Sequence, residues 1–168
     1  KVELTGKSIL ILGSGGVARA IAFSLLMNAP IKNLRILGIV EEEIDTLVSD
    51  LSQLKVAKVE GRLLNKIILS ESIAEAEILI NCTPIGMYPR ISESPVPVEF
   101  FKPQLIVFDV VYNPPQTKLL KEAAQAGCLT ISGLEMFINQ AVIQFELWTG
   151  EKAPVAVMGR ALLEQLKL

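Results

Sequence analysis

Residues 7–21 read KSILILGSGGVARAI. The first six residues form a short apolar run, which is typical of a strand covered on both faces of a sheet. Gly13 ends this run, and from Val17 to Met27 the apolar residues recur at helical spacing. The segment therefore predicts a strand, a glycine turn and a helix in succession.

The glycine turn matches the pattern G-x-G-x-x-G/A through Gly13, Gly15 and Ala18. In dinucleotide-binding folds the first glycine permits the tight turn and the second lets the backbone approach a pyrophosphate. The amides at the start of the helix then face the phosphates. A turn that only packs is the alternative, but the flanking strand and helix favour a nucleotide site. The residues expected to bind NADP or NAD here are Gly13, Ser14, Gly15, Gly16 and Val17.

The rest of the chain alternates apolar runs with helical patterns. Strands are expected at 33–40, at an edge near 56–59, and at 77–81, 105–110 and 128–132. Helices are expected at 41–54, 117–126, 134–148 and 154–167. Prolines between Cys82 and Pro103 predict a long loop. This alternation predicts an α/β fold, a doubly wound Rossmann-type parallel sheet of about six strands with helices on both faces.

The length and composition exclude several classes of protein. A chain of 168 residues suits one domain, with 1–6 leading into it and 153–168 as its C-terminal helix. The formal net charge of -2 provides no basic surface for nucleic acid or a membrane, and no apolar run reaches about 18 residues. Without histidine, imidazole metal ligands and histidine-dependent nucleophiles are excluded. We expect a cytoplasmic protein without a metal site, whose Cys82 and Cys128 are reduced and buried.

Selectivity for the adenosine ribose is usually set just after the second strand, by an acidic residue for NAD or a nearby arginine for NADP. Residues 38–43 read GIVEEE, so no basic side chain is at hand and three carboxylates would repel a 2′-phosphate. Glu41 is a candidate ligand of a ribose hydroxyl. Acidic residues that open a helix are more often a solvated cluster facing the helix dipole. The segment argues against NADP.

Three segments resemble the shikimate dehydrogenase family: GSGGVARAI at 13–21, NCTPIGM at 81–87, and the long run 109–150 that begins DVVYNPPQTKLLKEAAQAG. The similarity extends from about Gly6 to the end and indicates the family's C-terminal, NAD(P)-binding domain. It implies an oxidoreductase that reversibly reduces 3-dehydroshikimate to shikimate with NADPH, in aromatic amino-acid biosynthesis. Relatives use quinate and NAD. The family's usual Asn-Arg-Thr segment is replaced here by Gly38, Ile39 and Val40, which again argues against NADP.

The resemblance also implies which residues contact the cofactor. Asn81, Thr83 and Met87 correspond to the loop on the nucleotide side. Val110 and Gly133 correspond to positions whose backbone borders the nicotinamide. Met136 corresponds to a position beside them.

Tyr112 and Gln140 resemble the family's substrate-contacting tyrosine and glutamine. Tyr112 follows a strand end, where open α/β sheets bind their ligands. A tyrosine that anchors its own turn and a solvated surface glutamine are the alternative readings. Asp109 closes an apolar strand and is interpreted as a structural carboxylate rather than a base, so no catalytic residue is assigned in this chain.

Residues 134–148 are apolar on two sides. We expect one stripe to cover the sheet and the other to need a different partner. The first stripe holds Leu134, Phe137, Ile138, Ala141, Val142, Phe145 and Trp148, and the second holds Met136, Gln140, Ile143 and Leu147.

In the family, the proton-relay lysine and aspartate and a serine-rich substrate pocket belong to an N-terminal domain of roughly a hundred residues. Nothing in this sequence resembles that domain. We therefore expect the chain to bind cofactor and part of shikimate or 3-dehydroshikimate but to be inactive alone. The missing domain or a homodimer would cover its apolar helix. The alternatives are a stand-alone dinucleotide-binding or regulatory module without catalysis and a quinate/shikimate dehydrogenase that uses NAD.

Overall fold

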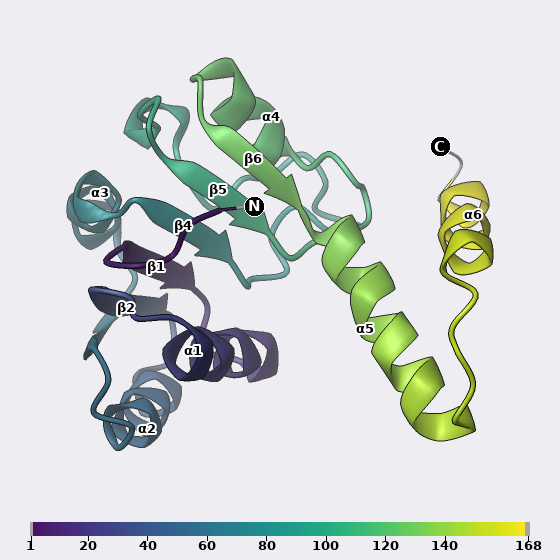
Figure 1. The fold of residues 1–168 in the computed structure, drawn as a ribbon. Helices are drawn as coiled ribbons and strands as arrows, with labels where there is room; N and C mark the ends of the chain where they lie inside the picture. The colour runs from purple at the N-terminus through teal and green to yellow at the C-terminus, as the bar shows by residue number, and fades with distance from the viewer. Residues whose placement is uncertain (1, 167–168) are drawn as a thin grey trace.

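The computed structural model describes residues 2–166, whose six strands form one parallel sheet (Figure 1). The strands lie side by side in the order β3-β2-β1-β4-β5-β6, so the sheet grows outward in both directions from β1 and β4. All five pairings are parallel. The strands are β1 (Ser8–Leu12), β2 (Asn33–Gly38), β3 (Lys58–Leu63), β4 (Ile78–Asn81), β5 (Ile106–Asp109) and β6 (Leu129–Ser132).

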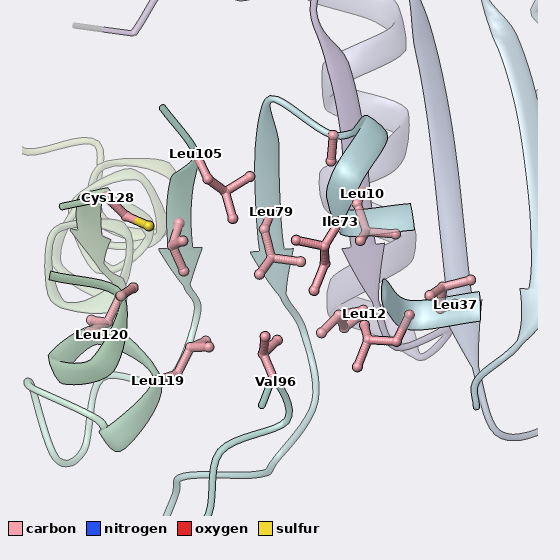
Figure 2. Close-up of a cluster of buried hydrophobic side chains, with 14 residues drawn as sticks. Leu10, Leu12, Leu37, Ile73, Leu79, Val96, Leu105, Leu119, Leu120 and Cys128 are labelled. Carbon is pink, nitrogen blue, oxygen red and sulfur yellow. The ribbon is translucent and has the colours of Figure 1, made fainter. Parts of the chain in front are cut away.

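Helices cover both faces of this sheet. Side chains of α1 (Gly16–Asn28) and α2 (Glu41–Ser52) pack on one face, in a cluster that includes Ile11 and Ile36. On the other face, α3 (Lys66–Glu75) and α4 (Lys118–Gln125) contribute side chains to a second cluster, which includes Leu12, Leu79 and Leu105 (Figure 2). The predicted doubly wound architecture is confirmed. The continuous apolar runs form β1 and β4, which are buried on both faces, and β5, whose Ile106 and Phe108 are only half-buried.

Two boundaries and one helix differ from the sequence-based expectation. β2 ends at Gly38 rather than at Val40, because Ile39 turns outward and is 80% exposed. The edge strand β3 lies at Lys58–Leu63 rather than near 56–59. The helix α3 was not expected from its weak pattern. Ile67, which is 72% exposed, adds an apolar residue on the solvent side and obscures the helical spacing.

The two C-terminal helices lie apart from the sheet. α5 (Gly133–Thr149) starts directly after β6 and extends away from the sheet, and the chain returns through α6 (Val155–Gln165) (Figure 1). Gly133 is the one buried residue of α5, so the expectation that one stripe of this helix covers the sheet is wrong. The reason is the direct junction with β6, which leaves no turn in which the helix could fold back. The predicted last residue of α6, Lys167, lies outside the described residues.

Within residues 2–166, no helix combines the length and the apolar character that crossing a bilayer requires.

Candidate functional site

The glycine turn lies where the order of the strands reverses, between the ends of β2 and β4. The Gly13 N–H donates to Leu37 O at 2.7 Å, and the Cys82 N–H donates to Leu12 O at 2.8 Å. Gly13 has φ of 105°, and a Cβ added there would lie 3.0 Å from Cys82 O. Only glycine adopts this conformation without strain in so tight a space. The carboxyl ends of the strands at such a reversal are where open α/β sheets bind ligands.

The start of α1 provides unoccupied backbone donors. Gly15 is the N-cap, and no side chain caps this helix end. A Cβ added at Gly15 or at Gly16 would meet nothing within 4 Å. Both glycines are exposed, and Val17 is 47% exposed. The open approach and the uncapped amides fit the diphosphate of a dinucleotide, which helix N-termini stabilise.

A cavity of about 280 Å³ opens beside the turn. The carboxyl ends of β1, β2, β3 and β4 all contribute to it, as expected for a nucleotide cleft. A larger hollow of about 510 Å³ lies against α3 and α4, away from the glycine turn. Residues that line the smaller cavity are Gly13, Ser14, Gly15, Leu37, Gly38, Ile39, Glu43, Leu64, Cys82, Thr83, Pro84, Ile85 and Arg90.

The acidic segment contributes to this cavity in a way that its sequence did not indicate. Glu43 lines the cavity, and its Oε2 accepts a hydrogen bond from Ser14 Oγ at 2.8 Å. Glu41, the predicted ribose ligand, is exposed at the start of α2 and is not among the lining residues. Its role as a ribose ligand stays a prediction.

Sequence reasoning also missed Arg90, which lines the same cavity from the loop between β4 and β5. This residue is distant in sequence from the segment after β2. A basic residue in a loop that leaves the carboxyl end of a central strand is the signal that would have identified it.

A chain of buried hydrogen bonds joins the ends of β4 and β5. Asn81, Asp109 and Thr117 are each fully buried. Asp109 Oδ1 accepts from Asn81 Nδ2 at 2.9 Å, and Asp109 Oδ2 accepts from Thr117 Oγ1 at 2.6 Å. Asn81 Oδ1 in turn accepts from Thr83 Oγ1 at 2.7 Å and from the Thr83 N–H at 3.0 Å. The network fixes the loop that carries Thr83 against the end of β5.

Burial raises the pKa of Asp109, and the hydrogen bonds from Thr117, Val111 and Asn81 only partly offset that effect. Every oxygen of this carboxyl has a protein donor, and none reaches solvent. The geometry supports the interpretation of Asp109 as structural. The Asn81 side chain is hydrogen-bonded within this network, so it positions Thr83 and does not itself line the cavity.

Both cysteines are free thiols. Cys128 is buried as predicted, whereas Cys82 is half-buried at the edge of the cavity. Burial, together with the nearby charge of Asp109, raises the pKa of Cys82 to about 12. Cys82 is therefore a neutral, unreactive wall of the site.

At the other end of the sheet edge, the structure brings Val110 and Gly133 together. A Cβ added at Gly133 would lie 2.4 Å from Val110 O, so this contact between two backbone segments requires glycine. One turn further along α5, the Phe137 ring stacks on Tyr112, with 4.1 Å between ring centroids. Gln140 is exposed one more turn on, on the second stripe of the helix rather than on the stripe of Phe137.

The remaining predicted residues lie near these groups. Met136 is half-buried on the first turn of α5. Met87 is 43% exposed in the loop after β4 and does not line the cavity. Most of the predicted residues thus form two groups, one at the glycine turn and one at the junction of β5, β6 and α5, whereas Glu41, Asn81 and Met87 do not line the cavity.

Comparison with known proteins identifies the family. A model of the shikimate 5′-dehydrogenase C-terminal domain matches residues 133–163. Over 162 residues the chain is 42% identical to the shikimate dehydrogenase (NADP(+)) of Moorella thermoacetica, an alignment that covers 96% of this chain and 54% of that protein. Along almost its whole length, the chain is therefore similar to the shikimate dehydrogenase family. It spans about half the length of the curated shikimate dehydrogenases that it matches.

Solved structures of this family and its neighbours share the fold. Shikimate 5-dehydrogenase from Listeria monocytogenes, crystallised with shikimate and NAD, superposes with a TM-score of 0.85 at 31% identity, over 95% of this chain and 57% of that one. Quinate dehydrogenase from Corynebacterium glutamicum in complex with NAD gives 0.84 at 31% identity, over 95% of this chain and 55% of that one. Shikimate dehydrogenase relatives therefore include proteins with either dinucleotide.

Proposed function

We propose that residues 1–168 form one Rossmann-type unit, the cofactor-binding half of a dehydrogenase that interconverts shikimate and 3-dehydroshikimate. The observation that carries this proposal is the glycine turn at the strand-order reversal, with uncapped amides at the start of α1 and an adjoining cavity. NADP or NAD would be bound with its diphosphate on these amides. When bound, the reduced dinucleotide supplies the hydride.

The chain's own residues would orient the cofactor and one side of the substrate. Val110 and Gly133 place two backbone segments in contact at the end of β5, which would form the surface against the nicotinamide. Tyr112 is held by its stacking on Phe137, and Gln140 presents an exposed amide on the same helix. A fixed hydroxyl and a nearby amide are suited to binding the hydroxyl groups of shikimate.

The acid-base group of the reaction would come from outside these residues. Asp109 is the carboxyl nearest in sequence to Tyr112, and it is fully buried and hydrogen-bonded within the protein. A general acid or base must reach the reacting hydroxyl directly or through one water. We therefore propose that the 168-residue chain binds cofactor but turns over no shikimate on its own. Steady turnover by the isolated chain would contradict this.

Cofactor binding is tested by the variant Gly15→Ala. The added methyl group occupies open space in the free protein, so stability should change little, but it would obstruct the approach of the diphosphate. Calorimetric titration with NADP and NAD should show affinity lowered by about tenfold or more, equivalent to about 1.4 kcal/mol. Gly159→Ala on α6 is the matched control, because that glycine also has nothing within 4 Å of an added Cβ. Equal affinity of wild type and Gly15→Ala would exclude the glycine turn as the phosphate site.

A quinate dehydrogenase that uses NAD is a second candidate, since the chain superposes on a quinate dehydrogenase about as well as on a shikimate dehydrogenase. Shikimate and quinate differ in the hydroxyl groups that they would present to Tyr112 and Gln140. NMR titration of the dinucleotide-saturated chain with shikimate and with quinate distinguishes them. Selective broadening of quinate signals, abolished by Gln140→Leu, would favour the second candidate.

A further inference from the structure

Arg90 lines the cavity that opens beside the glycine turn. The same cavity is lined by Gly38 and Ile39, which end β2, and by Leu64, which follows β3. Selectivity for the ribose is set at the end of the second strand of such folds. Arg90, in the loop that leaves β4, therefore shares one cavity with the residues at the expected ribose end.

The loop that carries Arg90 is anchored on both sides. Gly86 is buried before it, and Val96, which is 1% exposed, packs after it into the core cluster on the face of α3 and α4. Between these anchors, Arg90 O accepts a hydrogen bond from the Glu93 N–H at 3.1 Å. The backbone of Arg90 is thus held in place beside the cavity.

The charges around the cavity leave Arg90 available for a ligand. Among residues 2–166, the ion pairs of arginine involve Arg19 and Arg35, and none involves Arg90. Glu43 is the carboxylate that lines the cavity, and its Oε2 is occupied by Ser14 Oγ. Arg90 thus has no ion-pair partner among the described residues, whereas Glu43 keeps its charge and accepts a hydrogen bond from a neutral hydroxyl.

We propose that Arg90 binds the 2′-phosphate of the adenosine ribose and gives this site a preference for NADP over NAD. The planar guanidinium can donate two parallel hydrogen bonds to a phosphate, which makes arginine suited to this contact. The contact would replace the basic residue that is absent from the segment after β2. It rests on the proposed function, because it assumes that the cavity holds a dinucleotide.

The test uses two nucleotides that differ only in the 2′-phosphate, adenosine 2′,5′-bisphosphate and adenosine 5′-monophosphate. Both are titrated calorimetrically into the wild-type chain, Arg90→Gln and Arg160→Gln. Arg160 is an exposed arginine on α6 and serves as the control. We expect the wild type to favour the bisphosphate by about tenfold, the contribution of one charge-assisted contact. Arg90→Gln should lose this preference while its affinity for the monophosphate stays within about twofold. Arg160→Gln should behave as wild type.

Thermal unfolding of each variant separates binding from folding, and Arg90→Gln should unfold as the wild type does because its side chain is exposed. A preference that survives in Arg90→Gln would overturn the proposal. Equal weakening of both nucleotides would overturn it as well, since Arg90 would then contact a group that they share. If the wild type bound neither nucleotide, the proposed function itself would fail, and this inference with it.

Discussion

Asp109 is a carboxyl group that is buried completely where β5 ends. Its two oxygens accept from Asn81, Val111 and Thr117, so three donors depend on one side chain. A buried donor without an acceptor costs about 1–3 kcal/mol. The residue therefore contributes to folding and, through Asn81, to the position of the loop that carries Thr83.

We predict that Asp109→Ala lowers the free energy of unfolding by about 3 kcal/mol or more, because three buried donors lose their acceptor. Asp109→Asn keeps one acceptor oxygen and should lose less. Urea denaturation monitored by circular dichroism measures both. A loss below 1 kcal/mol for Asp109→Ala would show that water replaces the carboxyl.

Comparison of the wild type with Asp109→Asn also tests how Asp109 makes the stability depend on pH. The pKa of Asp109 in the folded protein is raised above 3.8, so the folded state holds this proton more tightly than the unfolded state does. Between 3.8 and the higher folded pKa, Asp109 therefore lowers stability as pH rises. We expect the stability of the wild type relative to Asp109→Asn to fall through this window and then to level off. A constant difference across the window would contradict the raised pKa.

At the scale of elements, the junction between β6 and α5 sets the direction of the longest helix. Ser132 Oγ accepts from the Leu134 N–H at 3.3 Å and caps α5, and Gly133 lies directly against Val110 O. Because the helix starts in contact with the end of β5, its first turns carry Phe137 to Tyr112. The end of β5 and the first turns of α5 are thus linked through one glycine.

We predict that Gly133→Ala destabilises the fold by about 1–3 kcal/mol, because its Cβ would lie 2.4 Å from Val110 O and the helix must move. The near-ultraviolet circular dichroism of the stacked Tyr112 and Phe137 should weaken as α5 shifts. Gly159→Ala, in open space inside α6, should raise the stability by up to about 1 kcal/mol through helix propensity and leave the spectrum unchanged. An unaltered spectrum in Gly133→Ala would mean that Val110 gives way instead of α5.

At the scale of the whole molecule, α5 and α6 form an arm that leaves the sheet (Figure 1), and several apolar side chains of this arm are exposed. Leu147 and Trp148 are 77% and 76% exposed, and Ile143 is 66% exposed. Apolar patches of this kind mark surfaces that contact another protein or another part of the same one. A homodimer and a further domain of the enzyme are both compatible with it.

We predict that replacing Ile143, Leu147 and Trp148 together by serine lowers self-association of the chain in sedimentation velocity. Its unfolding free energy should change by less than about 1 kcal/mol, because the three side chains lie in water. Leu119→Ala is the contrasting change: this leucine is 0% exposed, and its truncation should cost about 2–5 kcal/mol. Unchanged association of the triple variant would show that the arm is not the adhesive surface.

Local sequence was sufficient for the strands, most helices and the glycine turn. A buried parallel strand is apolar throughout, and a tight turn with φ of 105° requires glycine at Gly13, so both are legible in a few consecutive residues. The helix α3 was not legible because Ile67 adds an apolar residue on its exposed side. The spacing of apolar residues therefore predicts a helix or strand only where the apolar residues are also the buried ones.

The charged residues that line the cavity and the direction of α5 were determined by the tertiary structure. Arg90 lines the cavity with Gly38 and Glu43 because parallel strands bring their carboxyl ends to one edge, whatever their separation in sequence. α5 leaves the sheet because Gly133 abuts Val110, a contact between segments that no local pattern encodes. The residues fixed the elements and the family, whereas the packing of distant segments determined which side chains share the cofactor site.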